Sequence, residues 1–271
     1  MKAFVTHFGF EFKTGLRNSN LLMMNYLFPI GVYIVLGLLM AKINASFLGT
    51  MVPAMGIFAI MASTILGMPG PLVDAREAGI YRSYKINGVP AFSILIIPAL
   101  TTIFHGLIAT ALISLSAPLL FGGLAPDSWL NLALVMIVTA FACAGIGALI
   151  SVISKDTRGT VLWSQLIFLP AMIIGGLMIP ISALPSSLAR VSMLLPTAHA
   201  MQASLGLAYH QETTVPPLGS LLALLANGLL AFGLATYLFN WDTRNASRRG
   251  HPLMALIAWV PFTVTILLRG H

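Results

Sequence analysis

The chain has 271 residues, of which 58% are hydrophobic and only 8% are charged, and its net charge is +7. Soluble globular proteins carry about 25% charged residues, so this composition excludes an ordinary soluble domain and indicates a protein embedded in the lipid bilayer. In a soluble protein the basic excess would favour nucleic acid as a partner. Here it is explained by the basic loops that membrane proteins keep on the cytoplasmic side. We therefore expect the bilayer as a partner and no nucleic acid.

Residues 1–18 predict a helix that lies in the membrane surface. On a helical wheel one side is apolar and is formed by Phe4, Val5, Phe8, Phe12 and Leu16. The opposite side carries Lys2, Lys13 and Arg17. A helix with one apolar and one basic face suits the headgroup region, where its cations meet anionic lipid. We expect these three cations to anchor an interfacial helix. The alternative is a soluble helix packed on another subunit.

Apolar runs of roughly 20 residues without charge predict six transmembrane helices. These are expected at 21–41, 50–73, 91–120, 129–153, 160–179 and 217–239. The stretch 180–216 is cut by prolines and carries several polar residues, which a lipid-exposed span does not tolerate. We expect short helices there that dip partway into the membrane or lie at its outer surface. The predicted fold is an all-α integral membrane protein with one transmembrane domain, residues 1–249.

Residues 250–271 form an apolar extension. Its segment 253–268 is marginal in length for a span and equally suited to an interfacial helix, so both possibilities stay open. The distribution of Lys and Arg predicts the orientation of the rest. With a cytoplasmic N-terminus, eleven of these residues lie on inner segments and two, Lys42 and Arg190, lie outside. A multi-pass topology with the N-terminus in the cytoplasm is therefore expected.

The sequence also excludes several activities. No lysine follows a glycine, so the ATP-binding motif G-x-x-x-x-G-K-[ST] is absent. All seven carboxylates fall in loops or at segment ends, and His105 is the one ionisable residue well inside a predicted span, which disfavours proton-coupled transport. We expect neither enzyme activity nor a metal site in this chain. An enzyme site near His199, His210 and Glu212 is kept as an alternative.

Small residues recur on the fourth predicted span, namely Ala140, Cys143, Ala144, Gly147 and Ala148. Such a face lets two helix backbones approach closely. The contact could lie within one chain or between two chains, and the sequence does not choose between them.

The charged segment 74–90 separates the second and third predicted spans and is the most informative positive signal. It is too long for a minimal turn, too short for a domain, and carries both signs of charge around Gly79 and Tyr81. A transporter without its own energy source needs a place where an external ATPase can act, and a short helix here would serve. The alternative is an ordinary positive-inside loop.

Three motifs in order carry a resemblance to a known family. They are Arg76-Glu77-Ala78-Gly79-Ile80 with Pro90, then Gly175-Gly176 through Pro180 and Pro185 to Leu195-Pro196-Thr197, and finally Tyr237-Leu238-Phe239-Asn240-Trp241-Asp242. Together with the interfacial helix and the six spans, they make the chain similar to the ABC-2 type permeases, the transmembrane subunits of bacterial ABC exporters. Ile80 replaces the family's commoner threonine, and residues 250–271 extend past its usual end.

The resemblance implies a permease in the inner membrane of a prokaryote that exports a drug, lipid, peptide or glycan-lipid. Its partners would be two P-loop ATPase subunits, which bind the ATP and Mg, and a second permease subunit, identical or different. This chain would hold no cofactor itself. The ATPase would contact Arg76, Glu77, Gly79, Arg82 and Lys85. The substrate pathway would include Asn25, Met61, Phe168 and Met172. The alternative function is a gradient-driven transporter or channel without an ATPase.

Overall fold

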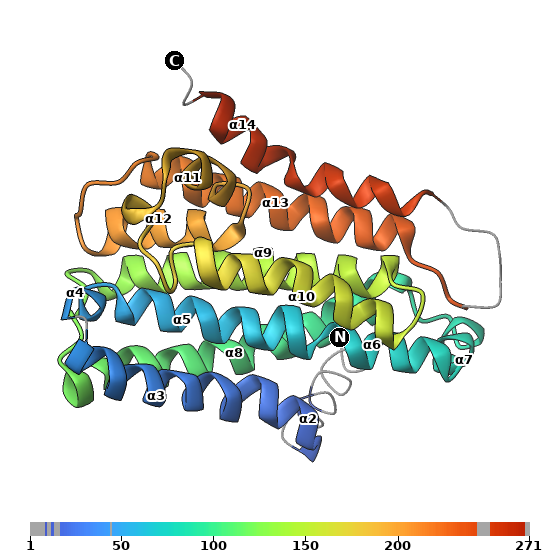
Figure 1. Cartoon of the computed structure of the whole chain (residues 1–271). Helices are drawn as coiled ribbons and strands as arrows, with labels where there is room; N and C mark the ends of the chain where they lie inside the picture. Colours follow the sequence, from blue (N-terminus) through green and yellow to red (C-terminus); the bar gives the residue numbers. More distant parts are fainter. Residues whose placement is uncertain (1–8, 10–11, 14–16, 44, 243–249, 269–271) are drawn as a thin grey trace.

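The computed structural model describes residues 9, 12–13, 17–43, 45–242 and 250–268. Most of the interfacial helix expected over 1–18, including Lys2, lies outside the described residues. Lys13 and Arg17 are described and exposed. All regular secondary structure in the described part is helical, and the long helices lie side by side in a bundle (Figure 1). The predicted all-α class is therefore confirmed.

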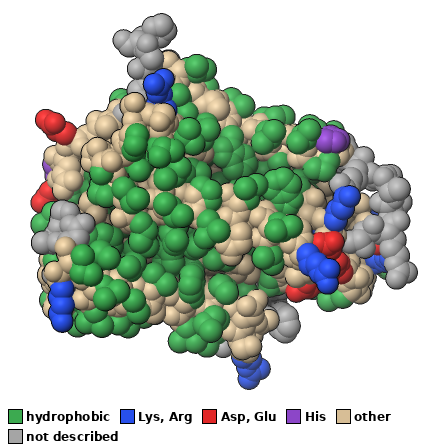
Figure 2. Space-filling model, in the orientation of Figure 1, with side chains coloured by type: hydrophobic (Ala, Val, Ile, Leu, Met, Phe, Trp, Pro, Cys, Tyr) green, Lys and Arg blue, Asp and Glu red, His purple; other side chains and the backbone are tan. Residues whose placement is uncertain are grey.

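Six described helical segments are long and apolar enough to cross a membrane. They are Ser19–Met40, Met51–Glu77, Ala91–Phe121, Trp129–Ile153, Thr157–Ile174 and Pro217–Leu238. Figure 2 shows hydrophobic side chains over most of the drawn face, with Lys, Arg, Asp and Glu mainly toward its edges. An apolar belt between two charged ends is the surface that a bilayer requires, so the chain is a multi-pass integral membrane protein.

The first two spans are each interrupted by a π-helical turn. The first runs through α2 (Ser19–Leu22), η1 (Met23–Leu27) and α3 (Phe28–Ile43). The second runs through α5 (Met51–Met61), η2 (Ala62–Gly67) and α6 (Pro69–Glu77). The turns η1 and η2 pack against each other. The second span thus continues to Glu77, so the first four residues of the charged segment 74–90 are helical.

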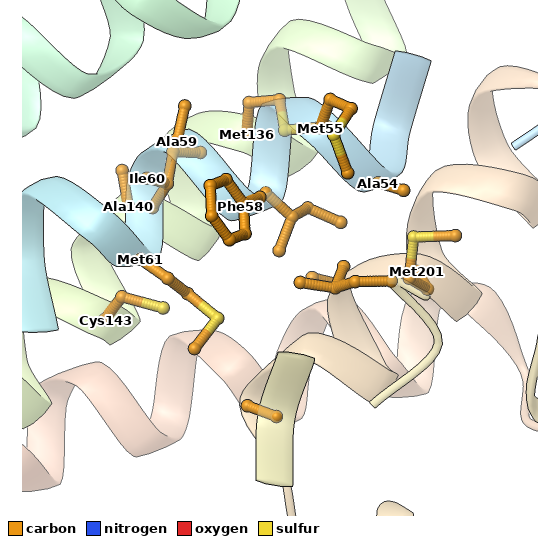
Figure 3. Packing of buried hydrophobic residues seen from close by; sticks show 14 of the residues in the cluster. Ala54, Met55, Phe58, Ala59, Ile60, Met61, Met136, Ala140, Cys143 and Met201 are labelled. Carbon is orange, nitrogen blue, oxygen red and sulfur yellow. The ribbon is translucent and has the colours of Figure 1, made fainter. Parts of the chain in front are cut away.

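The second span forms the centre of the bundle. Of its most apolar stretch 94% is buried, against 22% for the first and the fifth spans. Figure 3 shows Phe58 and Met61 of α5 among side chains that include Cys143 of α9 (Trp129–Ile153) and Met201 of α12 (Pro196–Ala208). The first span and α10 (Thr157–Ile174) are consequently the least buried spans, and most of their side chains are left to contact lipid or another chain.

The small-residue face of α9 packs inside this chain. Its alanines and Cys143 are fully buried, and Gly147 is buried as well. A methyl group added at Gly147 would overlap the carbonyl oxygen of Thr64 in η2. At Gly145 a methyl group would lie 3.1 Å from the backbone of Gly228 in α13 (Pro217–Leu238). The small residues therefore allow α9 to approach η2 and α13 closely. They form a contact within one chain, which was one of the two possibilities that the sequence left open.

The stretch 180–216 folds into three short helices. They are η3 (Ile181–Ala183), α11 (Ser186–Ser192) and α12. Most of α11 is exposed, whereas α12 is almost wholly buried and packs on α9 and α13. The remaining elements are α4 (Ala45–Leu48), α7 (Ile80–Ile86) and α8 (Ala91–Phe121), with η4 (Pro252–Trp259) and α14 (Val260–Leu268) after the sixth span. In Figure 1, α7 lies at one end of the bundle and α4 at the other.

Candidate functional site

The α7 end of the bundle is built around a sharp turn between two helices. Helix α6 ends at Glu77, and α7 begins at Ile80. Between them Gly79 has φ +76°, a left-handed conformation that costs glycine little and other residues much more. Glycine at this position lets the chain stop one helix and start the next within two residues. We call residues 74–86 the α6–α7 corner.

Arg76 fixes the α6–α7 corner to the end of α9. Its guanidinium donates hydrogen bonds to the carbonyl oxygens of Ser151, at 3.0 Å, and of Ser154. Only 5% of Arg76 is exposed. The last carbonyls of a helix lack partners within the helix and carry partial negative charge, so a buried cation is well placed there. Arg76 thus contacts α9 within this chain, and its expected contact with an ATPase stays a prediction.

The carboxylates of the corner contact the start of α10. The hydroxyl of Thr157 donates a hydrogen bond to Oδ1 of Asp74 at 2.7 Å and lies 3.3 Å from Oε2 of Glu77. Thr157 is the first residue of α10, and negative groups are favourable at a helix N-terminus. Together with Arg76, these contacts connect the corner to both sides of the short loop between α9 and α10.

Helix α7 is tied to the residues that follow α13. The hydroxyl of Tyr81 donates a hydrogen bond to the carbonyl oxygen of Leu72 at 2.9 Å, and its ring lies 5.6 Å from that of Phe239. Arg82 forms an ion pair with Asp242 at 2.7 Å. The hydrogen bond and the charge of Asp242 raise the pKa of Arg82. The corner therefore touches the ends of three spans, namely α9, α10 and α13.

Several residues of the corner face outward. Glu77, Arg82 and Lys85, all predicted from the sequence, are exposed, and Gly79 is half-exposed. The most exposed apolar side chain here is Ile86, at 86%, which the sequence reasoning missed. An isoleucine between Lys85 and Asn87, in a charged segment outside the apolar belt, was the available signal. We add Ile86 to the residues of the corner that are open to a docking protein.

The predicted pathway residues lie in two places. Met61 and Phe168 belong to the central hydrophobic cluster, against which the half-buried Met172 packs. Asn25 lies in η1 and is buried, and its Oδ1 atom has no hydrogen-bond partner among the described residues. π-turns are frequent at functional sites. A groove of about 290 Å³ lies elsewhere, between α8 and α9, and none of these four residues lines it.

The histidines singled out in the sequence have separate surroundings. The hydroxyl oxygen of Tyr26 lies 2.6 Å from Nδ1 of His105, and the ring of Phe12 stacks on His105 at 4.5 Å. His199 is buried, with Nε2 2.9 Å from the carbonyl oxygen of Met193. His210 is exposed and pairs with Asp127 at 3.3 Å. The described part of the chain contains no group of three potential metal ligands.

Comparison with known proteins gives one family. A family model described as ABC-2 type transporter matches residues 2–209. No curated protein and no solved structure gave a match. The matched range contains the first five spans, the α6–α7 corner and the short helices through α12.

Proposed function

Because the chain belongs to the ABC-2 type transporter family and is a permease subunit of an ABC transporter, we propose that it exports an amphipathic or hydrophobic substrate, driven by an ATPase on a separate chain. The substrate would be a drug, lipid, peptide or glycan-lipid. Two P-loop ATPase subunits would bind the ATP and Mg, and a second permease subunit, identical or different, would complete the transporter. This chain supplies the membrane part and the surface on which the ATPase acts.

The observation that carries the proposal is the α6–α7 corner. Its outer side presents Glu77, Lys85 and Ile86, while its inner side holds α9 through Arg76 and α10 through Asp74. A protein that docks on the outer side and changes shape would move the ends of these spans together. Conversion of such a movement into rotation or rocking of packed helices is a common transport mechanism.

The orientation follows from the basic residues of the loops. Arg82 and Lys85 lie in the corner, and Lys155 and Arg158 lie in and beside the loop between α9 and α10, which the corner contacts. By the positive-inside rule we infer that this end of the bundle would face the cytoplasm of a prokaryotic cell. The ATPase and the corner would then meet in the same compartment, with α11 toward the outer side.

The pathway would run beside the second span. The first and fifth spans flank it and are the least buried, so their outer faces are the surface we assign to the second permease subunit. Asn25 would meet polar parts of the substrate, and Met61, Phe168 and Met172 would meet apolar parts. Methionine adapts to ligands of different shape because its side chain is flexible and polarisable.

The test is purification of the tagged chain from solubilised native membranes, with and without Glu77→Lys. We expect a P-loop ATPase to copurify with the unchanged chain and to be lost with Glu77→Lys, while both chains insert equally. Lys155→Glu is a matched control, because it changes an exposed charge of a neighbouring loop. Copurification of the ATPase with Glu77→Lys, together with normal export, would refute the docking site.

The pair of His105 and Tyr26 favours a second candidate, a gradient-driven transporter. An ionisable residue inside the membrane with a hydrogen-bond partner is a common feature of proton relays. This function would be indicated by a chain that purifies without an ATPase and by transport that stops when the proton gradient is dissipated.

A further inference from the structure

The last described segment, residues 252–268, packs on α13 with both η4 and α14 and runs in the opposite direction (Figure 1). At its start, a methyl group added at Gly250 would meet Leu238, the last residue of α13. Near its end, Ile266 packs on the cluster that contains Val215, just before α13 begins. We call residues 252–268 the C-terminal strap.

Two polar contacts fix the strap between these ends. The side-chain amide of Asn227, in the middle of α13, donates a hydrogen bond to the carbonyl oxygen of Ala258 at 2.7 Å. Farther along, the ring of His199 stacks on Phe262 at 4.8 Å, and its Nε2 atom lies 3.4 Å from the hydroxyl of Thr265. Asn227 and His199 are fully buried. The strap therefore covers polar groups that lipid could not hydrogen-bond.

The strap is longer than its number of residues suggests. Its first eight residues form the 3₁₀ helix η4 and its last nine form the α-helix α14. A 3₁₀ helix rises about 2.0 Å per residue and an α-helix about 1.5 Å, so the strap spans about 30 Å. This length equals the hydrocarbon thickness of a typical bilayer, about 30 Å. Most outward side chains, including Leu253, Leu256 and Leu267, are apolar and strongly exposed, and the hydroxyl of the exposed Thr263 donates a hydrogen bond to the carbonyl oxygen of Val260.

We propose that the C-terminal strap is a seventh membrane crossing, which brings the end of the chain out on the side opposite α7. The strap covers α13, which itself is long enough to cross the membrane, from the α7 end to the level of α11. At that level Ala189 and Ile266 pack on the same cluster, next to the exposed Arg190. An interfacial helix would instead stay at the level of Leu238 and could not reach His199.

The crossing has a consequence for the assembly. The described residues on either side of the segment 243–249, Asp242 and Gly250, both lie at the α7 end, because Asp242 pairs with Arg82 and a methyl group at Gly250 would meet Leu238. Leu268, the last described residue, lies at the other end of the strap, out of reach of an ATPase that docks on the α6–α7 corner. A tag or partner at the C-terminus would thus be separated by the membrane from one at α7.

The test is the sidedness of two single cysteines in a Cys143→Ala background, which removes the native thiol. Lys85→Cys marks the α7 side and His271→Cys marks the end of the chain. A membrane-impermeant maleimide is applied to intact spheroplasts and to inverted vesicles. We expect the two cysteines to react from opposite sides. Reaction of both from the same side would overturn the proposal.

Cross-linking provides a second readout, independent of the topology of the tail. The pair His199→Cys with Thr265→Cys should be joined by a short bifunctional thiol reagent, because the two side chains are in contact. The matched pair His199→Cys with Leu253→Cys should not be joined, since Leu253 lies at the other end of the strap. Absence of the first cross-link in a chain that remains monodisperse in detergent would also overturn the proposal.

Discussion

The guanidinium of Arg76 donates a hydrogen bond to the carbonyl oxygen of Ser151, 75 residues farther along the chain, at 3.0 Å. The contact joins the end of the second span to the last turn of α9. Its neighbour Glu77 is exposed on the same helix. Two adjacent residues of one motif thus differ in their surroundings, since Arg76 joins the second span to α9 and Glu77 faces outward.

Replacement of Arg76 by alanine should destabilise the bundle. The carbonyl oxygens of Ser151 and Ser154 would lose their donor, and a buried acceptor without a partner costs about 1–3 kcal/mol. We expect a lower unfolding temperature in detergent, measured by intrinsic fluorescence. The unfolding temperature of Arg76→Lys should lie between those of the unchanged chain and Arg76→Ala, because lysine keeps the charge but cannot form the same fork of hydrogen bonds. Arg82→Ala is the control, and an equal loss in both alanine variants would contradict the assignment.

Ile86→Glu should release the ATPase without affecting insertion. The side chain is 86% exposed at the tip of the corner, so a charge there costs no packing within the chain. The matched control is Ile43→Glu, which changes the same residue type at 73% exposure at the far end of the first span. Copurification of the ATPase should fall for the first variant and stay for the second. Equal retention would show that Ile86 takes no part in docking.

Gly147→Ala should loosen the contact between α9 and η2. The added methyl group would overlap the carbonyl oxygen of Thr64, a backbone atom that cannot rotate away. Overpacking of this kind typically costs about 1–3 kcal/mol. Gly233→Ala is the control, because nothing lies within 4 Å of a methyl group there. The midpoint of thermal unfolding should be lower for Gly147→Ala than for Gly233→Ala. Similar midpoints would mean that α9 and η2 are farther apart than described.

Asn25→Leu should preserve stability and reduce transport. The buried Oδ1 atom has no partner among the described residues, and an unsatisfied polar group costs about 1–3 kcal/mol. An apolar side chain of similar size should therefore be tolerated or even stabilising. Export of a fluorescent amphipathic dye by the reconstituted transporter should slow if Asn25 contacts the substrate. An unchanged export rate would remove Asn25 from the pathway.

Much of the fold could be predicted because lipid imposes a simple rule on the sequence. Six charge-free runs of about 20 residues gave six spans in the right order. The ends of the spans were harder to predict where a capping side chain, rather than hydropathy, decides where the helix begins. The fifth span was expected to begin at residue 160, but it begins at Thr157 because the carboxylate of Asp156 accepts a hydrogen bond from the backbone N–H of Gly159 at 2.7 Å. It ends at Ile174, before Gly176 takes φ +90°.

The direction of individual side chains was beyond the sequence. Arg76 points inward because the end of α9 lies beside it, and nothing near Arg76 in the sequence records that contact. His105 was recognised as an unusual residue, but its neighbour Tyr26 lies 79 positions away. The length of the strap could not be predicted from the sequence either. A length calculated from the number of residues assumes the rise of an α-helix, whereas η4 is a 3₁₀ helix with a larger rise per residue.

The paired π-turns have a consequence for changes in chain length. A π-turn contains one residue more than the corresponding turn of an α-helix. Deletion of one residue within Ala62–Gly67 can therefore convert η2 into ordinary α-helix while both flanking helices keep their faces toward the same neighbours. The same deletion within Met51–Met61 would turn every later residue of that span by about 100°. The second span thus has one region that absorbs a deletion and one that does not.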